Sequence, residues 1–278
     1  MNRRDFLALA AAASLRAQTP DPNAIWVCPM DPDIRQHDPG TCPRCNMKLV
    51  AGLPEPVEYH LDLTTTPRAL KTGQPLDLAF AVTDPWKDRP VTKFQVVHER
   101  LFHMFVVSQD LDFFLHDHPV LGADGKFHYK NLVLPKPGMY RVLGDFYPDA
   151  ATPQLITKTL FVAGEAQSPV PAPPTNTKID LRTEPERPIA DLNTQLHFRL
   201  TPGEGLERYL GAWGHMLVAS DDLVDLIHTH PFIADGGPEM QFNVTFPRPD
   251  HDYRVWVQFQ RDGVVNTAHF DVRANDLH

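Results

Sequence analysis

The feature that most constrains this chain is an internal repeat centred on histidine. The segments 103–119 and 215–231 lie 112 positions apart and, aligned without gaps, carry the same residue at nine of 17 places. The shared residues include a leading His-Met and a closing His-x-His-Pro. A duplication of this kind indicates two copies of one folded unit. The fold is therefore one that the chain builds twice.

Each copy predicts a strand, a turn and a second short strand. An apolar, partly β-branched run leads into Ser-x-Asp-Leu, which is typical of a turn, and the closing histidines sit on a further extended piece. Side chains alternate across a strand, so the two closing histidines of each copy share one face. If the two strand pieces pair as antiparallel neighbours, the leading histidine lies beside the two closing histidines. This predicts two metal sites, one from His103, His116 and His118 and one from His215, His228 and His230.

A structural role for these imidazoles is the alternative, in which each one bonds a neighbouring backbone group. Recurrence of three histidines at one spacing favours metal binding. His98 is a candidate to assist the first site, although its counterpart in the second copy is Leu210. Asp110 and Asp222 are expected to cap their turns and not to bind an ion. Because a Pro-rich linker is expected to keep the copies apart, we expect two independent sites.

Short alternating segments bounded by Pro, Gly and Asp run through both copies. The chain has 28 prolines against 15 glycines and few helical patterns, which favours an all-β class. We predict two tandem immunoglobulin-like β-sandwiches preceded by a small metal-knuckle domain. The expected boundaries are a signal at 1–17, the small domain at 18–53, sandwiches at 54–163 and 178–278, and a Pro-rich linker at 164–177.

The amino end carries paired arginines followed by a short Ala/Leu run. It resembles a twin-arginine export signal, which implies a periplasmic or secreted protein. The run is too short to span a bilayer, so no membrane span is expected in the mature chain. A formal net charge of −9 disfavours nucleic acid as a partner and favours cations.

The only cysteines, Cys28, Cys42 and Cys45, fall within 18 residues. An odd number suits a disulfide framework poorly, and the alternative of one disulfide with a stray thiol leaves one cysteine unexplained. A Cys-x-x-Cys pair with a distant Cys-Pro turn is able to close a thiolate site for copper or zinc. Asp31 or His37 is the candidate fourth ligand. Met30 and Met47 are candidate thioether ligands for Cu(I), or else pack against Trp26 and Leu49.

Residues 26–50 also resemble a known family. Cys-Pro-Met followed by Pro-Gly-Thr-Cys-Pro-x-Cys-x-Met is similar to the heavy-metal-binding domain attached to copper-transporting ATPases and metal-efflux adaptor proteins. The resemblance implies that the partners are metal ions and a metal-efflux or copper-transport system. The usual form has His and Gly where this chain has Asp31 and Asn46.

The two repeats, which cover most of 57–273, resemble secreted immunoglobulin-like or cupredoxin-like modules found in bacterial copper-resistance contexts. We therefore expect an exported metal-binding protein, with copper as the first candidate, that sequesters or transfers ions. One alternative is a copper-dependent oxidoreductase, although no Glu or Tyr recurs beside the histidines as acid or base. Another is a structural two-sandwich module with a zinc-stapled head. An enzymatic role is the less favoured hypothesis.

Overall fold

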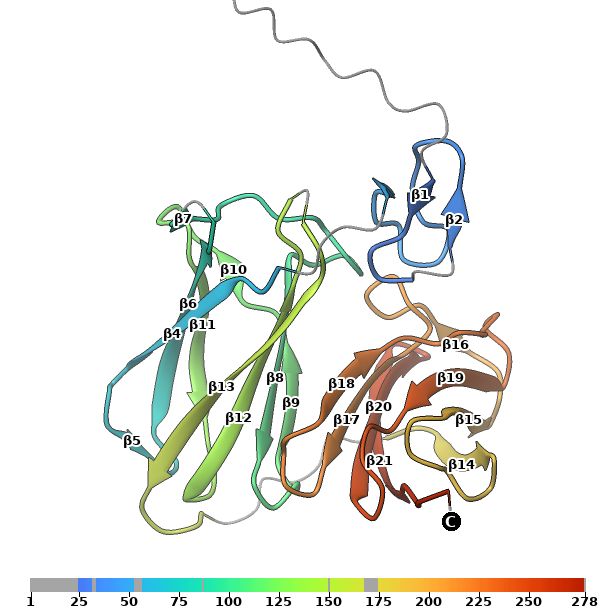
Figure 1. Ribbon diagram of the computed structural model, residues 1–278. Helices are drawn as coiled ribbons and strands as arrows, with labels where there is room; N and C mark the ends of the chain where they lie inside the picture. The colour runs from blue at the N-terminus through green and yellow to red at the C-terminus, as the bar shows by residue number, and fades with distance from the viewer. Residues whose placement is uncertain are drawn as a thin grey trace, which may run out of the picture.

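The structure is a computed structural model that describes residues 25–31, 34–52, 57–86, 88–149, 151–167 and 175–277. These residues form strands, turns and loops with no helix, and accordingly none of them belongs to a helix able to cross a membrane. The predicted signal at 1–17 and the Pro-rich part of the linker at 169–174 lie outside the described residues. Figure 1 shows two sandwiches side by side with a small head above them.

The head is a three-stranded antiparallel sheet in the order β2-β1-β3. Its strands are β1 (Trp26–Val27), β2 (Arg35–Gln36) and β3 (Val50–Ala51). Strands this short bury little apolar surface, and the core of the head consists of its three cysteines with Met47 and Leu49, completed by Val97 and Tyr147 of the first sandwich. The head is thus built around sulfur and rests on its neighbour.

The first sandwich packs two sheets, ordered β10-β11-β6-β4, with β7 on β6, and β5-β13-β12-β8-β9. Strands such as β6 alternate buried and partly exposed positions, as expected where one face meets the core. The strands are β4 (His60–Thr66), β5 (Leu70–Lys71), β6 (Pro75–Asp84), β7 (Arg89–Pro90), β8 (Phe102–Ser108), β9 (Phe114–Asp117), β10 (Val120–Leu121), β11 (Phe127–Val133), β12 (Gly138–Phe146) and β13 (Gln154–Ala163).

The second sandwich repeats the plan with sheets β14-β15-β19 and β16-β20-β17-β18, with β21 on β20. Its strands are β14 (Lys178–Glu184), β15 (Asn193–Thr201), β16 (Leu206–Glu207), β17 (His215–Ser220), β18 (Leu226–Thr229), β19 (Glu239–Thr245), β20 (Asp252–Arg261) and β21 (Val264–Arg273). Together with the head, these two sandwiches confirm the predicted all-β, immunoglobulin-like fold class.

The two sandwiches pack against each other through the repeated strands. Every residue of β8 and of β17 is buried, because one face of each strand meets its own core and the other meets the second copy. Phe105 and Val107 of β8 lie in one apolar cluster with Leu217 and Ala219 of β17. The expectation that the linker keeps the copies apart is therefore wrong. The apolar second face of each strand provides the surface that joins them.

The contacts across this interface follow an approximate two-fold relation. Arg141 donates from Nε to the Leu223 carbonyl at 3.2 Å, and Arg254 donates from Nη1 to the Leu111 carbonyl at 3.1 Å. The two arginines are the centres of the repeated Tyr-Arg-Val motif, and the two leucines occupy the repeated turns with φ of 61° and 57°. The duplicated segments thus recognise one another.

The repeated turns are closed by their aspartates, as predicted. Asp110 accepts a hydrogen bond from Ser108 at 2.5 Å, and Asp222 accepts one from Ser220 at 2.6 Å. Both side chains also accept from a backbone N–H two residues further on. These carboxylates hold the loops that precede β9 and β18 and so set where the closing histidines begin.

Candidate metal centres

The head gathers its three thiols and one carboxylate around a single point. One ligand atom from each of Cys28, Asp31, Cys42 and Cys45 lies within 4.8 Å of the others. The sulfurs of Cys28 and Cys45 are 3.6 Å apart, and Asp31 Oδ2 is 3.4 Å from the Cys42 sulfur and 3.8 Å from that of Cys28. Metal–sulfur bonds of about 2.3 Å in a tetrahedral site place sulfurs about 3.8 Å apart. The four side chains therefore suit a thiophilic ion.

The two departures from the usual heavy-metal-binding motif both have a structural reason. Asn46 has φ of 62° in the turn that follows Cys45, a conformation that Gly adopts freely and Asn tolerates better than most residues. Asp31 takes the place of the usual histidine among the sulfurs, and Arg44 Nη1 lies 2.8 Å from its second oxygen. Of the two candidates for the fourth ligand, the structure places Asp31 in the site and His37 on the exposed surface.

The two methionines lie close to the thiols in different ways. Met47 is 1% exposed and belongs to the core of the head. Met30 is partly buried, with its sulfur 3.9 Å from the Tyr147 hydroxyl. Met47 thus packs in the manner of an ordinary core residue, whereas Met30 lies on the side that faces the sandwiches.

The thiols have unequal proton affinities. A hydrogen bond from Cys45 lowers the pKa of Cys28 to about 6, against the opposing effect of burial. The same hydrogen bond and burial raise the pKa of Cys45, and burial raises the pKa of Cys42. At neutral pH one thiolate is ready to meet a cation, and binding of the ion releases the remaining thiol protons.

The repeat histidines form one cluster at the interface of the two sandwiches. Nitrogens of His103, His116 and His215 lie within 4.8 Å of one another, and so do nitrogens of His215, His228 and His230. The alternation of β8 and β17 explains this, since the leading histidines share a face with the residues that join the copies. The two predicted sites therefore lie side by side in one cluster, and His215 belongs to both groups.

In the first copy, hydrogen bonds fix which nitrogens carry protons. His103 donates from Nε2 to the Val97 carbonyl at 3.0 Å, and His116 donates from Nδ1 to Gln258 Oε1 at 2.9 Å. The lone pairs of His103 Nδ1 and His116 Nε2 then face each other at 3.3 Å. His118 Nε2 is 3.2 Å from the same His103 nitrogen. Tetrahedral metal–nitrogen bonds of about 2.0–2.1 Å place nitrogens about 3.3 Å apart.

The second copy reproduces this arrangement. His215 donates from Nε2 to the Tyr209 carbonyl at 3.0 Å, and its Nδ1 lies 3.0 Å from His230 Nε2. His228 donates from Nδ1 to Asp145 Oδ2 at 2.5 Å, which leaves its buried Nε2 without a hydrogen-bond partner among the described residues. A buried, unpartnered imidazole nitrogen beside two other histidines is suited to bind an ion.

Burial keeps most of these imidazoles neutral. Desolvation lowers the pKa of His103 to about 4 and of His98 and His118 to about 3. It also lowers the pKa values of His116, His215 and His230 well below the ordinary range. Neighbouring imidazoles add to the effect in each case. An incoming ion thus finds unprotonated ligands.

The metal-free protein is expected to lose stability as the pH falls from about 6.5 toward 4. In this window the unfolded chain takes up protons on these histidines and the folded chain does not, so the free energy of unfolding falls by about 1.4 kcal/mol per pH unit for each one. His98→Leu, which copies Leu210, removes one such group and should flatten the slope by that amount. Urea unfolding at pH 7.5, 6.0 and 5.0 measures both slopes, and equal slopes would refute the assignment.

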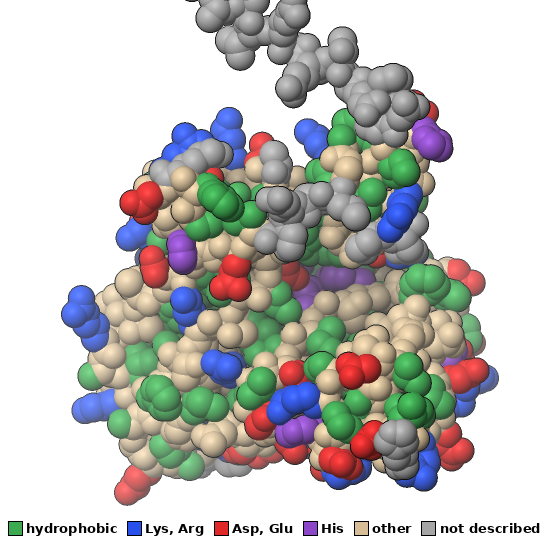
Figure 2. Space-filling model, viewed as in Figure 1, with side chains coloured by type: hydrophobic (Ala, Val, Ile, Leu, Met, Phe, Trp, Pro, Cys, Tyr) green, Lys and Arg blue, Asp and Glu red, His purple; other side chains and the backbone are tan. Residues whose placement is uncertain are grey.

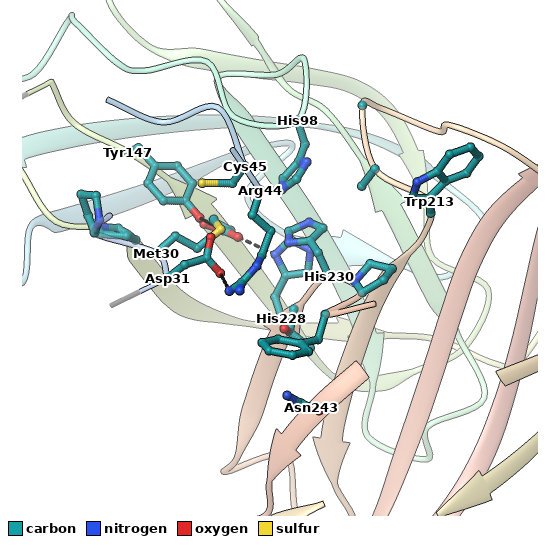
Figure 3. Close-up of a pocket in the computed structure, with 18 of the residues that line it drawn as sticks. Met30, Asp31, Arg44, Cys45, His98, Tyr147, Trp213, His228, His230 and Asn243 are labelled. Carbon is teal, nitrogen blue, oxygen red and sulfur yellow. Dashed lines mark hydrogen bonds and ion pairs between the residues drawn. The ribbon is translucent and has the colours of Figure 1, made fainter. Parts of the chain in front are cut away.

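A cavity of about 820 Å³ joins the two candidate centres. One wall comes from the head, with Met30, Asp31 and Cys45, and another comes from the cluster, with His98, His228 and His230. Figure 2 shows histidine side chains in the hollow between the head and the sandwiches, and Figure 3 shows the two walls facing each other. Sulfur and imidazole ligands therefore meet in one space.

Three further residues contact the histidine cluster, and of these the sequence pointed only to His98. The His98 ring lies against that of His230, with ring centroids 3.7 Å apart and planes at 30°, and its Nε2 is buried and unpartnered among the described residues. Asp145 and Gln258 hold the middle histidines from across the interface. Asp145 and Gln258 each lie five positions after the tyrosine of the Tyr-Arg-Val motif, so they are equivalent positions of the repeat. Nothing in the sequence shows that either residue contacts a histidine of the opposite copy.

Comparison with known proteins gives one family model for the two sandwiches and one for the head. A family model described as "Domain of unknown function (DUF8832)" matches residues 56–162 and 175–276, and one described as "Heavy metal binding domain" matches residues 25–51. No curated protein matches the chain. A solved structure, "Crystal structure of chicken CNTN1 FN1-FN3 domains", is 10% identical over 82% of this chain and 73% of that one, and its TM-score of 0.22 is too low for further comparison.

Proposed function

We propose that this chain, which belongs to the family described as "Domain of unknown function (DUF8832)" and carries a heavy-metal-binding domain at residues 25–51, binds heavy-metal ions. Copper is the first candidate. The ions are transferred between the head and the histidine cluster. The observation that carries the proposal is the shared cavity. Cys45 and Asp31 line it on one side, and His228 and His230 line it on another.

The chemistry of the two ligand sets favours transfer. Thiolates and thioethers are soft ligands that select Cu(I), whereas imidazoles suit Cu(II) and also Zn(II). A chain that offers both sets on one cavity holds copper in either oxidation state. Zinc fits the same donors and is the second candidate ion.

Export forms part of the same proposal. The paired arginines at the amino end support twin-arginine export to the periplasm or the medium. The natural partners there are metal ions together with a metal-efflux or copper-transport system, of the kind to which heavy-metal-binding domains are attached. An acidic protein suits the capture of cations.

A displacement experiment tests the transfer. The full chain is loaded with one equivalent of cobalt(II), whose thiolate absorption reports the head, and the more thiophilic cadmium(II) is then added beside a dye that reports free cobalt. We expect cobalt to move to the cluster, so the dye stays silent with the parent and responds with a His228→Ala/His230→Ala variant. Equal release of cobalt from both proteins would contradict the proposal.

A further inference from the structure

The two halves of the histidine cluster are related by the repeat, yet one pair of equivalent positions differs. Asp145 of β12 pairs with His103, and Gln258 of β20 pairs with His215. Each side chain crosses the interface to the middle histidine of the other copy. Asp145 Oδ2 lies 2.5 Å from His228 Nδ1, and Gln258 Oε1 lies 2.9 Å from His116 Nδ1.

This difference changes the chemistry of the two middle histidines. A carboxylate that accepts the N–H of a metal-binding imidazole fixes its tautomer and makes the opposite nitrogen a stronger donor to the ion. An amide oxygen fixes the tautomer without adding negative charge. The Gln258 amide nitrogen donates to Thr267 Oγ1 at 3.0 Å, and its oxygen faces His116. Both histidines are therefore held alike, but only His228 is backed by a carboxylate.

The environment of Asp145 strengthens the effect. Asp145 is 6% exposed and the His228 side chain is 2% exposed, so water screens little of the charge on the Asp145 carboxylate. A divalent ion bound to His228 Nε2 is thus stabilised by a buried negative charge on the far side of the ring. The equivalent position behind His116 supplies a neutral dipole.

The same half of the cluster also faces the cavity. His228 and His230 line it together with Cys45, whereas none of the three histidines of the first copy does so among the described lining residues. An ion that leaves the head meets His228 before it meets His116. Position and electrostatics therefore favour the same half.

We propose that the cluster is a two-ion centre with unequal halves, in which Asp145 makes His215, His228 and His230 the primary ion site. The half backed by Gln258, with His103, His116 and His118, is the weaker site and fills second. The proposal rests on the proposed function, since it requires that the cluster bind metal. Asp145 acts as a positioning residue through His228.

Titration of the full chain with cobalt(II) tests the order of filling. Thiolate charge-transfer absorption marks the ion in the head, and weaker ligand-field bands without it mark ions in the cluster. We expect two separated cluster steps in the parent. Asp145→Asn should weaken the first of these steps by about 10–100-fold and bring the two together, because a neutral amide replaces the carboxylate.

Gln258→Glu is the matched control, because it supplies a carboxylate to the other half while Thr267 remains able to donate to it. This variant should strengthen the second step and leave the first unchanged. Thermal unfolding of both metal-free variants shows whether they fold like the parent. Equal weakening of both steps in Asp145→Asn, or no shift in either variant, would overturn the proposed order while leaving metal binding intact. A parent that binds no cobalt in the cluster would overturn the proposed function as well.

Discussion

Replacing Cys28, Cys42 and Cys45 together with serine is expected to remove the tightest-bound ion and to open residues 25–52 to protease, with both sandwiches left folded. The core of the head consists of these thiols with Met47 and Leu49 and two residues of its neighbour. A segment with so little apolar surface depends on its ion, and structural zinc contributes about 10–16 kcal/mol in comparable small domains. Limited proteolysis followed by mass spectrometry measures the effect.

Chelation of the metal should reproduce this result in the parent protein under reducing conditions. Asp31→Asn is the matched control, because it keeps the three thiols and the size of the fourth side chain. We expect Asp31→Asn to weaken ion binding by the head while leaving the head partly protected from protease. A head that resists protease in metal-free, reduced parent protein would show that the ion is not needed for its fold.

Replacing His215 with alanine is expected to weaken the first ion-binding step of the histidine cluster most, because His215 belongs to the primary half. Its nitrogens belong to both groups of three, one of which contains His103 and His116 of the other copy. Loss of a ligand should cost at least about 100-fold in affinity, since loss of a residue that merely supports a ligand costs 10–100-fold. Isothermal titration of Zn(II) into head-blocked protein measures each step.

His197→Ala is the control for this substitution. His197 is also buried, but it bonds Glu239 at 3.0 Å and lies outside both groups. It should leave the affinities of the cluster unchanged. Parental affinity at the first cluster step in His215→Ala would contradict the assignment of His215 as a ligand.

The sequence allowed the grouping of the three thiols and the fold class to be predicted, because both follow from local spacing and periodicity. The spacing of Cys28, Cys42 and Cys45 indicated a thiolate site, and the period of two in His-x-His placed the closing histidines on one face. The repeat indicated two sandwiches.

The arrangement of the copies could not be predicted in the same way. The pattern of β8 shows that its second face is apolar, but several surfaces could cover such a face. Only the packed structure shows that Phe105 meets Leu217 and that the two sets of histidines therefore merge. Asp145 is equally silent in the sequence, because its role depends on a contact with His228, 83 positions away. Sites formed between domains depend on docking, which periodicity does not encode.

X-ray absorption spectroscopy of the full chain, titrated with copper under anaerobic, reducing conditions and then oxidised, tests the central claim most directly. It counts the sulfur and nitrogen ligands of each added ion. We predict a sulfur-rich environment for the first equivalent and nitrogen ligands for the following ones, in numbers that fall when His215 is replaced. A chain that binds one sulfur-ligated ion and no other would contradict the claim that head and histidine cluster both bind metal.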